Sequence, residues 1–313
     1  MTVETTDPSP VPVTIDATPS ARGLVGGSRL RTLARRSNRR GAAQLGVHLG
    51  CMGATGTLVW LTLPEWYLLV PAMVLHGITI VTMFAPMHEC THRTAFSPRR
   101  ANDLVGWCAG VLSFYNATYY RYFHAWHHRY TQDPARDPEL MYSRASDRLA
   151  YFKEISGLMF WYRRAIDYPA LALGRAGGLP FVPAVARRPI ARSMSCQLVI
   201  YLAAVAASAI GHTAALYFWF LPALLAMPLL RFYLITEHTL CSRDGNGLSN
   251  TRTTLALFPI RLLMWNMPYH SEHHLFPSIP FHQLPALHRQ LRGRLVHVAP
   301  GYLATNREIF RSL

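Results

Sequence analysis

The stretch WYLLVPAMVLHGITIVTMFAPM (residues 66–87) contains no Asp, Glu, Lys or Arg. As a helix it is long enough to cross a hydrocarbon core about 30 Å thick. A second uncharged run, 45–63, precedes it, and only Pro64 and Glu65 separate the two, so together they predict a transmembrane hairpin. Uncharged runs at about 193–211 and 214–230 predict another. A single run is also compatible with a buried helix of a soluble core, but two hairpins favour an all-α membrane protein with four transmembrane helices.

The arginine distribution predicts the orientation of these helices. Arginines cluster before the first and third spans, whereas the tight turns inside the hairpins carry no Lys or Arg; the clustered residues are Arg29, Arg31, Arg35, Arg36, Arg39, Arg40, Arg187, Arg188 and Arg192. By the positive-inside rule, the N-terminal segment, residues 88–192 and the C-terminal part face the cytoplasm. We expect a disordered cytoplasmic tail (1–40, rich in Pro, Thr, Ser and Arg), a membrane domain with a cytoplasmic helical cap (41–300) and a C-terminal tail (301–313).

The overall composition excludes some classes of protein. The chain is 50% hydrophobic and only 15% charged, below the quarter or so of a soluble domain, and its net charge is +15. A positive charge of this size could bind nucleic acid, an anionic membrane surface or an acidic partner protein. No zinc-finger, recognition-helix or basic-aromatic pattern is present, so nucleic acid is not expected. The five cysteines are scattered without a CxxC pair, which favours reduced thiols over disulfides.

Three histidine-rich motifs, which we call boxes, carry the chemistry: HECTH (88–92), HAWHH (124–128) and HSEHH (270–274). Residues i, i+3 and i+4 of a helix share one face, so each box would point its histidines the same way. Neutral imidazole is a strong transition-metal ligand. Eight such ligands exceed the four of a tetrahedral zinc and suit two metal ions with open positions. The predicted ligands are His88, His92, His124, His127, His128, His270, His273 and His274, with His238 as a ninth candidate.

A shared metal site also constrains the topology. The run 104–120 is uncharged and could nearly span a membrane. If it did, the box at 124–128 would lie on the opposite side from the other two, so we expect it to be re-entrant, interfacial or packed in the cap. The remaining histidines are unclustered, and we expect structural roles for them: His48, His76, His212, His282, His288 and His297.

The three boxes, in this order, together with HHRYTQDPARDPEL (127–140) and NMPYHSEHHLFPSIPFHQLP (266–285), resemble the membrane fatty-acid desaturase superfamily. Its members include acyl desaturases, sphingolipid desaturases, hydroxylases and carotenoid ketolases. The resemblance covers roughly residues 45–290. It implies four transmembrane helices, a cytoplasmic cap and a di-iron (Fe²⁺) centre held mostly by histidine, and it makes His238 a ligand.

Polar neighbours of the boxes are candidates for a supporting role. Glu89, Glu237 and Glu272 each adjoin a predicted ligand and could either orient imidazoles or simply cap and solvate a helix. Asn266, four residues before His270, could support that ligand. A carboxylate-bridged centre of the soluble four-helix type needs two ExxH motifs and two further Glu, and only the ExxH at 89–92 is present.

The expected reaction is the dioxygen-dependent desaturation of a fatty acyl or similar apolar chain. Hydroxylation or ketolation of an apolar substrate such as a carotenoid, or action on a small amphiphilic metabolite, remains open, because the ligand set does not distinguish these outcomes. The aromatic stretches 105–120 and 157–162 could line a substrate channel or serve as interfacial packing. A metal transporter is disfavoured, since transporters place ligands near the bilayer midplane and these boxes lie outside the spans.

Each turnover requires two external electrons, and the chain has neither an HPGG haem motif nor a GxGxxG fingerprint. We therefore expect a separate acidic electron donor, ferredoxin-like or cytochrome b5-like, with its reductase. Arginines near the boxes could form its docking surface or face anionic lipid; they are Arg93, Arg99, Arg100, Arg129, Arg136, Arg289, Arg292 and Arg294.

Overall fold

A computed structural model of the chain describes residues 21, 23–142 and 145–313. Almost all regular structure in this part is helical. The first four helices are α1 (Gly27–Leu33), α2 (Asn38–Thr62), α3 (Trp66–Val81) and α4 (Phe84–Thr91). Then follow α5 (Arg99–Leu112), α6 (Ala117–Tyr130), α7 (Pro138–Tyr142), α8 (Arg148–Ile155), α9 (Leu158–Ala172), α10 (Ala184–Ala209), the π-helical turn η2 (Leu216–Phe220) and α11 (Leu221–Leu234). The C-terminal part contains β1 (Thr253–Thr254), α12 (Phe258–Leu263), α13 (His270–Leu275), the 3-10 turn η3 (Phe281–Gln283), α14 (Leu284–Leu291), β2 (Val298–Ala299) and α15 (Tyr302–Ser312).

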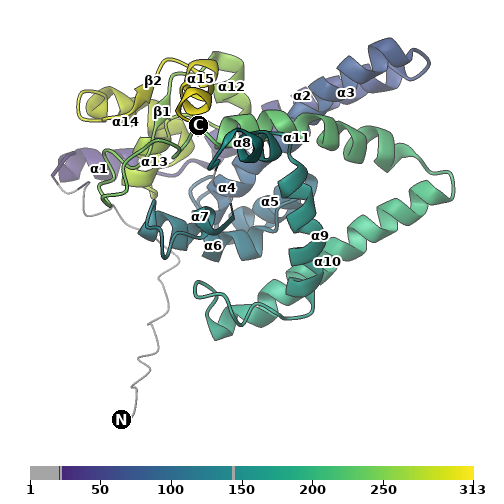
Figure 1. Cartoon of the computed structure of the whole chain (residues 1–313), viewed down its shortest axis with the longest axis horizontal. Helices are drawn as coiled ribbons and strands as arrows, with labels where there is room; N and C mark the ends of the chain where they lie inside the picture. The colour runs from purple at the N-terminus through teal and green to yellow at the C-terminus, as the bar shows by residue number, and fades with distance from the viewer. Residues whose placement is uncertain (1–20, 22, 143–144) are drawn as a thin grey trace, which may run out of the picture.

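Four of these helical segments are long and apolar enough to cross a membrane, which confirms the four predicted spans. They are Asn38–Thr62, Trp66–Thr91, Ala184–Ala209 and Leu216–Leu234. The two hairpins, α2–α3 and α10–α11, extend from the same side of the remaining helices (Figure 1). At Gly77 the second span lies so close to the fourth that a Cβ would come within 1.9 Å of the Pro222 carbonyl oxygen. Glycine therefore allows the two hairpins to pack together.

The second span continues further than its uncharged run. α4 follows α3 after a short turn, so His88 lies in the last turns of the span and not beyond it as the sequence indicated. The extension is stable because α4 is buried in protein and packs against α5 and α6.

The ambiguous run 104–120 is not a continuous helix. α5 ends at Leu112, Phe114 adopts a left-handed backbone conformation (φ 61°), and α6 begins at Ala117, where the Asn116 side chain accepts a hydrogen bond from the Tyr119 N–H. The Asn116 amide also donates to Gln197 of α10, at 2.9 Å. The run is therefore not one of the helices long enough to cross a membrane, and all three boxes can meet.

The described residues of both expected tails include helices. Residues 1–20 and 22 of the expected tail lie outside the described residues. Within 23–40, however, α1 buries Leu33 against the apolar face of α14. The expected C-terminal tail contains α15, whose buried Asn306 binds the Phe232 carbonyl at 3.0 Å and the Tyr151 hydroxyl at 2.9 Å. α1 and α15 therefore each cover part of the protein interior.

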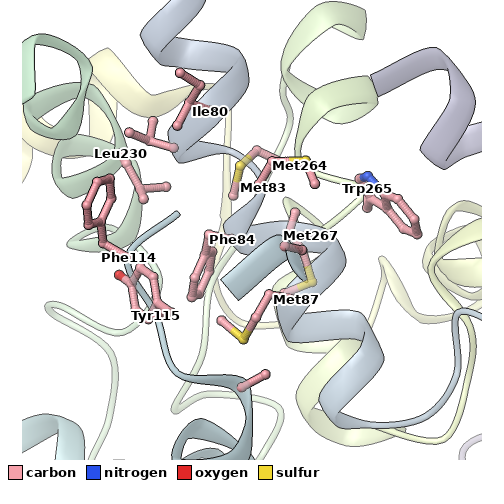
Figure 2. Close-up of a cluster of buried hydrophobic side chains, with 14 of the residues drawn as sticks. Ile80, Met83, Phe84, Met87, Phe114, Tyr115, Leu230, Met264, Trp265 and Met267 are labelled. Atoms are coloured by element: carbon pink, nitrogen blue, oxygen red, sulfur yellow. The ribbon is translucent and has the colours of Figure 1, made fainter. Parts of the chain in front are cut away.

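A buried apolar cluster joins the spans to the segment that carries the third box. Figure 2 shows Phe84 and Met87 of α4 between Phe114 and Tyr115 on one side and Met264, Trp265 and Met267 on the other. Trp265 is fully buried, and its indole N–H donates to His48 Nδ1 of α2 at 3.3 Å. His48 thus has the structural role that its isolation in the sequence predicted.

Candidate metal centre

The nine candidate histidines converge from four separate parts of the chain. α4 supplies the first box, α6 the second and α13 the third, and His238 lies in the turn after α11. Eight of them are at most 9% exposed, and His92 is intermediate. Water therefore has little access to their ring nitrogens.

The histidines form two groups. In the five-histidine group, the ligand nitrogens lie within 4.8 Å of one another; its members are His88, His92, His124, His128 and His273. In the second group, His127, His238 and His274 meet the same criterion, and His270 Nε2 lies 3.1 Å from His238 Nε2. On α6, His124 and His128 belong to the first group, whereas His127, which lies between them in the sequence, belongs to the second.

The donor atoms fit a metal ion. In the five-histidine group, His128 Nε2 lies 2.9 Å from His124 Nε2 and 3.1 Å from His273 Nε2. Both nitrogens of His88 and the Nε2 atoms of His92 and His274 are buried without a hydrogen-bond partner among the described residues. Because buried polar atoms are normally satisfied, so many converging lone pairs indicate a cation site.

Seven of the candidate rings have the protonation state that a metal requires. Burial lowers the pKa of His92 and of His238 to about 3. Burial, followed by the neighbouring imidazoles, lowers the pKa of the other ring groups well below its usual value; this holds for His124, His128, His270, His273 and His274. These rings are therefore neutral at physiological pH and keep a lone pair for coordination.

A buried carboxylate that the sequence analysis missed orients His127. Asp137 is 1% exposed, and its Oδ1 lies 2.8 Å from His127 Nδ1. Burial alone would lower the pKa of His127, but Asp137 and Glu139 outweigh it and raise the pKa to about 9. The hydrogen bond at Nδ1 leaves Nε2 directed towards His238, 3.2 Å away. This arrangement matches the carboxylate–histidine pairs that support metal ligands in other proteins.

Three other candidate rings are held through Nδ1 in the same way. His238 Nδ1 lies 3.2 Å from the Asn250 carbonyl oxygen, and His274 Nδ1 lies 3.2 Å from Thr131 Oγ1. The Tyr120 hydroxyl lies 3.3 Å from His124 Nδ1. Each contact leaves Nε2 available to the centre.

The four predicted supporting residues have different roles. Glu237 lies beside a ligand as expected, with Oε1 3.5 Å from His270 Nδ1. Glu89 instead accepts the Phe281 N–H at 3.0 Å, and the Asn266 amide donates to the Phe281 carbonyl at 3.2 Å.

The Glu272 carboxylate also contacts residues other than the nine candidate histidines. It accepts a hydrogen bond from Thr253 at 2.5 Å and pairs with His288 of α14. These contacts of Glu89, Asn266 and Glu272 thus connect box-bearing segments to neighbouring segments and not to a candidate ligand ring. His288, predicted to be unclustered, is the partner of a fully buried carboxylate.

A cavity of about 530 Å³ reaches the centre, within the size range of small-molecule sites. His88, His124, His238 and His270 form part of its wall. Both aromatic stretches contribute to the lining; the residues are Tyr115, Tyr119, Tyr120 and Phe160. Other members of the stretches serve packing, as Phe114 and Trp161 do with ring centroids 4.9 Å apart. The two stretches therefore contribute both to the cavity wall and to side-chain packing.

The fold and the site define an all-helical membrane protein with a buried, histidine-rich centre able to hold metal. The fatty acid desaturase family model matches residues 64–306, and the chain belongs to this family of oxidoreductases. Among similar proteins is the sn-1 oleoyl-lipid 12-desaturase of a Picosynechococcus species, 31% identical over 38% of this chain and 37% of that enzyme. Enzymes of the same name from a Synechocystis species (27% identical, 76% of this chain and 72% of the enzyme) and Anabaena variabilis (23%, 72% and 69%) match over longer stretches.

Proposed function

We propose that the protein is a di-iron, dioxygen-dependent desaturase that introduces a double bond into a fatty acyl or similar apolar chain. The observation that carries the proposal is the pair of buried histidine groups on the wall of one cavity. The similar proteins are named as desaturases of an oleoyl lipid, which supports an acyl substrate. The membrane domain would comprise residues 41–300, to which the helical segments within 23–40 and 301–313 add packing surfaces.

The five-histidine group would hold one Fe²⁺ and the second group the other. Bound iron would supply the dioxygen-dependent removal of hydrogen from an unactivated C–H bond. The protein's own contribution is to fix the ligand rings through their Nδ1 atoms, to exclude water by burial, and to hold the chain between Tyr115, Tyr120 and Phe160. Whether a second hydrogen or an oxygen atom is transferred depends on how the substrate carbon is held.

The test is product analysis by mass spectrometry after expression in a host that lacks desaturases. A desaturase gives lipids with two hydrogen atoms fewer and a C=C bond at one position. A product that gains oxygen would replace this proposal with the hydroxylase or ketolase alternative, and unchanged lipids would refute an action on acyl lipids.

We further propose that both termini and the three boxes lie on the cytoplasmic face. The proposal is supported by the arginine-free turns and by the position of the box-bearing helices α4, α6 and α13 at the same end of the two hairpins (Figure 1). Single cysteines should be introduced at Glu65 and Arg129 in a cysteine-free background and labelled with an impermeant reagent. We expect labelling at 65 from outside only and at 129 from the cytoplasmic side only; labelling of 129 from outside would contradict this orientation.

The electron donor would dock on the arginine surface near the boxes. Seven of the eight arginines are exposed, and Arg93 is paired with Asp103 at 3.3 Å. We expect reconstituted turnover with a ferredoxin and its reductase to fall steeply as salt rises, because the Debye length shrinks from about 10 Å at 0.1 M to about 3 Å at 1 M. The double variant R289E/R292E should raise KM for the donor about tenfold, equivalent to about 1.4 kcal/mol.

R307E, which changes an exposed arginine outside this set, is the matched control and should leave that KM unchanged. Turnover by the purified single chain from NAD(P)H and dioxygen alone would contradict the requirement for a separate donor.

A further inference from the structure

The carboxylate of Glu139 lies at the junction between the two histidine groups. The ligand atoms of His124, His127 and Glu139 are all within 4.8 Å of one another, and Glu139 Oε2 is 3.7 Å from His127 Nε2. His124 belongs to the five-histidine group and His127 to the second group. Metal–nitrogen and metal–oxygen bonds in proteins are roughly 2.0–2.2 Å long, so two donors 3.7 Å apart can bind the same ion.

The backbone fixes Glu139 in this position. It lies in the first turn of α7, and its N–H donates to Asp137 Oδ1 at 3.0 Å. The same oxygen accepts the hydrogen bond of His127 Nδ1, and Asp137 Oδ2 accepts the Gln132 N–H at 2.8 Å. The Asp137 carboxylate therefore fixes both the orientation of the His127 ring and the start of α7, the helix that carries Glu139.

The side chain of Glu139 faces the cavity. It is 36% exposed and forms part of the cavity wall together with His124 and His238. The guanidinium of Arg231, also in this wall, is paired with Glu154. The Glu139 carboxylate therefore lies on the side of the histidine groups that faces the cavity.

Charge gives an independent reason for a carboxylate here. The imidazole rings carry no negative charge, and Asp137, the carboxylate bonded to His127, would offset only part of the charge of two divalent cations in a buried site. Uncompensated buried charge is costly, and a carboxylate bound directly to the metal reduces it most effectively.

We propose that Glu139 is a tenth ligand of the metal centre, binding where the two histidine groups meet. This inference rests on the proposed di-iron function. It differs from the soluble carboxylate-bridged design, because a single glutamate joins a set otherwise made of histidine.

The test compares purified full-length wild type, Glu139→Gln, Glu139→Asp and the control Asp133→Asn, each loaded with ⁵⁷Fe. Asp133 is another carboxylate of the same loop, and it pairs with Arg136. Mössbauer spectra and chelator competition are measured in the absence of substrate. For Glu139→Gln we expect an altered spectrum and at least about tenfold weaker binding of one iron, since even outer-sphere partners change metal affinity by 10–100-fold.

Glu139→Asp retains the oxygen donors and should be intermediate, and Asp133→Asn should match the wild type. A Glu139→Gln protein with the wild-type spectrum and affinity would overturn the inference while leaving the di-iron proposal intact. A wild-type protein that binds fewer than two irons would overturn both.

Discussion

His128→Ala is expected to abolish substrate oxidation while the protein still inserts into the membrane. His128 Nε2 lies 2.9 Å from His124 Nε2 and 3.1 Å from His273 Nε2, at the centre of the five-histidine group. Its loss removes a donor that no neighbouring side chain can replace. We expect a decrease of more than about 100-fold in product per chain, beyond the 10–100-fold typical of residues that only support a ligand.

Product and iron should be measured on the same purified sample. The same outcome is expected for single alanine variants of His124, His127, His270, His273 and His274. His212→Ala, an exposed histidine in the turn after α10, is the control and should remain fully active. Full activity in two of the ligand variants would contradict a centre built from these boxes.

Asp137→Asn is expected to produce the second largest loss. The substitution preserves shape but removes the charge that fixes His127, and it places an amide N–H donor opposite either His127 Nδ1 or the Gln132 N–H. We expect iron affinity and turnover each to fall by about 10–100-fold. Chelator competition and product analysis measure the two effects.

Asp133→Asn is the matched control for this variant as well, because it neutralises a carboxylate of the same loop whose partners are Arg136 and the Ala135 N–H. If Asp137→Asn retained wild-type iron affinity, Asp137 would serve only to form the loop and would not support the ligand.

The four spans could be predicted because the absence of charge over a membrane thickness is a direct physical requirement. Their ends could not. The third span, α10, begins at Ala184 and includes Arg187, Arg188 and Arg192, since a helix can continue beyond the apolar part of its sequence. The second extends through His88 because neighbouring cap helices bury it.

The convergence of the boxes could also be predicted, because metal ligands must share one side of the membrane. Their division into two groups could not. His124 and His127 are three residues apart on α6 yet lie in different groups, which depends on where α13 and His238 pack.

For the supporting residues, proximity in the sequence was a poor guide to contact in the structure. Glu272 adjoins ligands in sequence, but adjacent helical residues point in different directions, and its carboxylate meets Thr253 and His288. Asp137, ten residues beyond His127, returns through the turn before α7 and makes the contact that was expected of the neighbours.

The most direct test of the account is the iron content of the wild-type protein purified from membranes, determined by elemental mass spectrometry against the protein concentration. The account predicts two iron atoms per chain, one for each histidine group. A ratio of one, or zinc in place of iron, would contradict it.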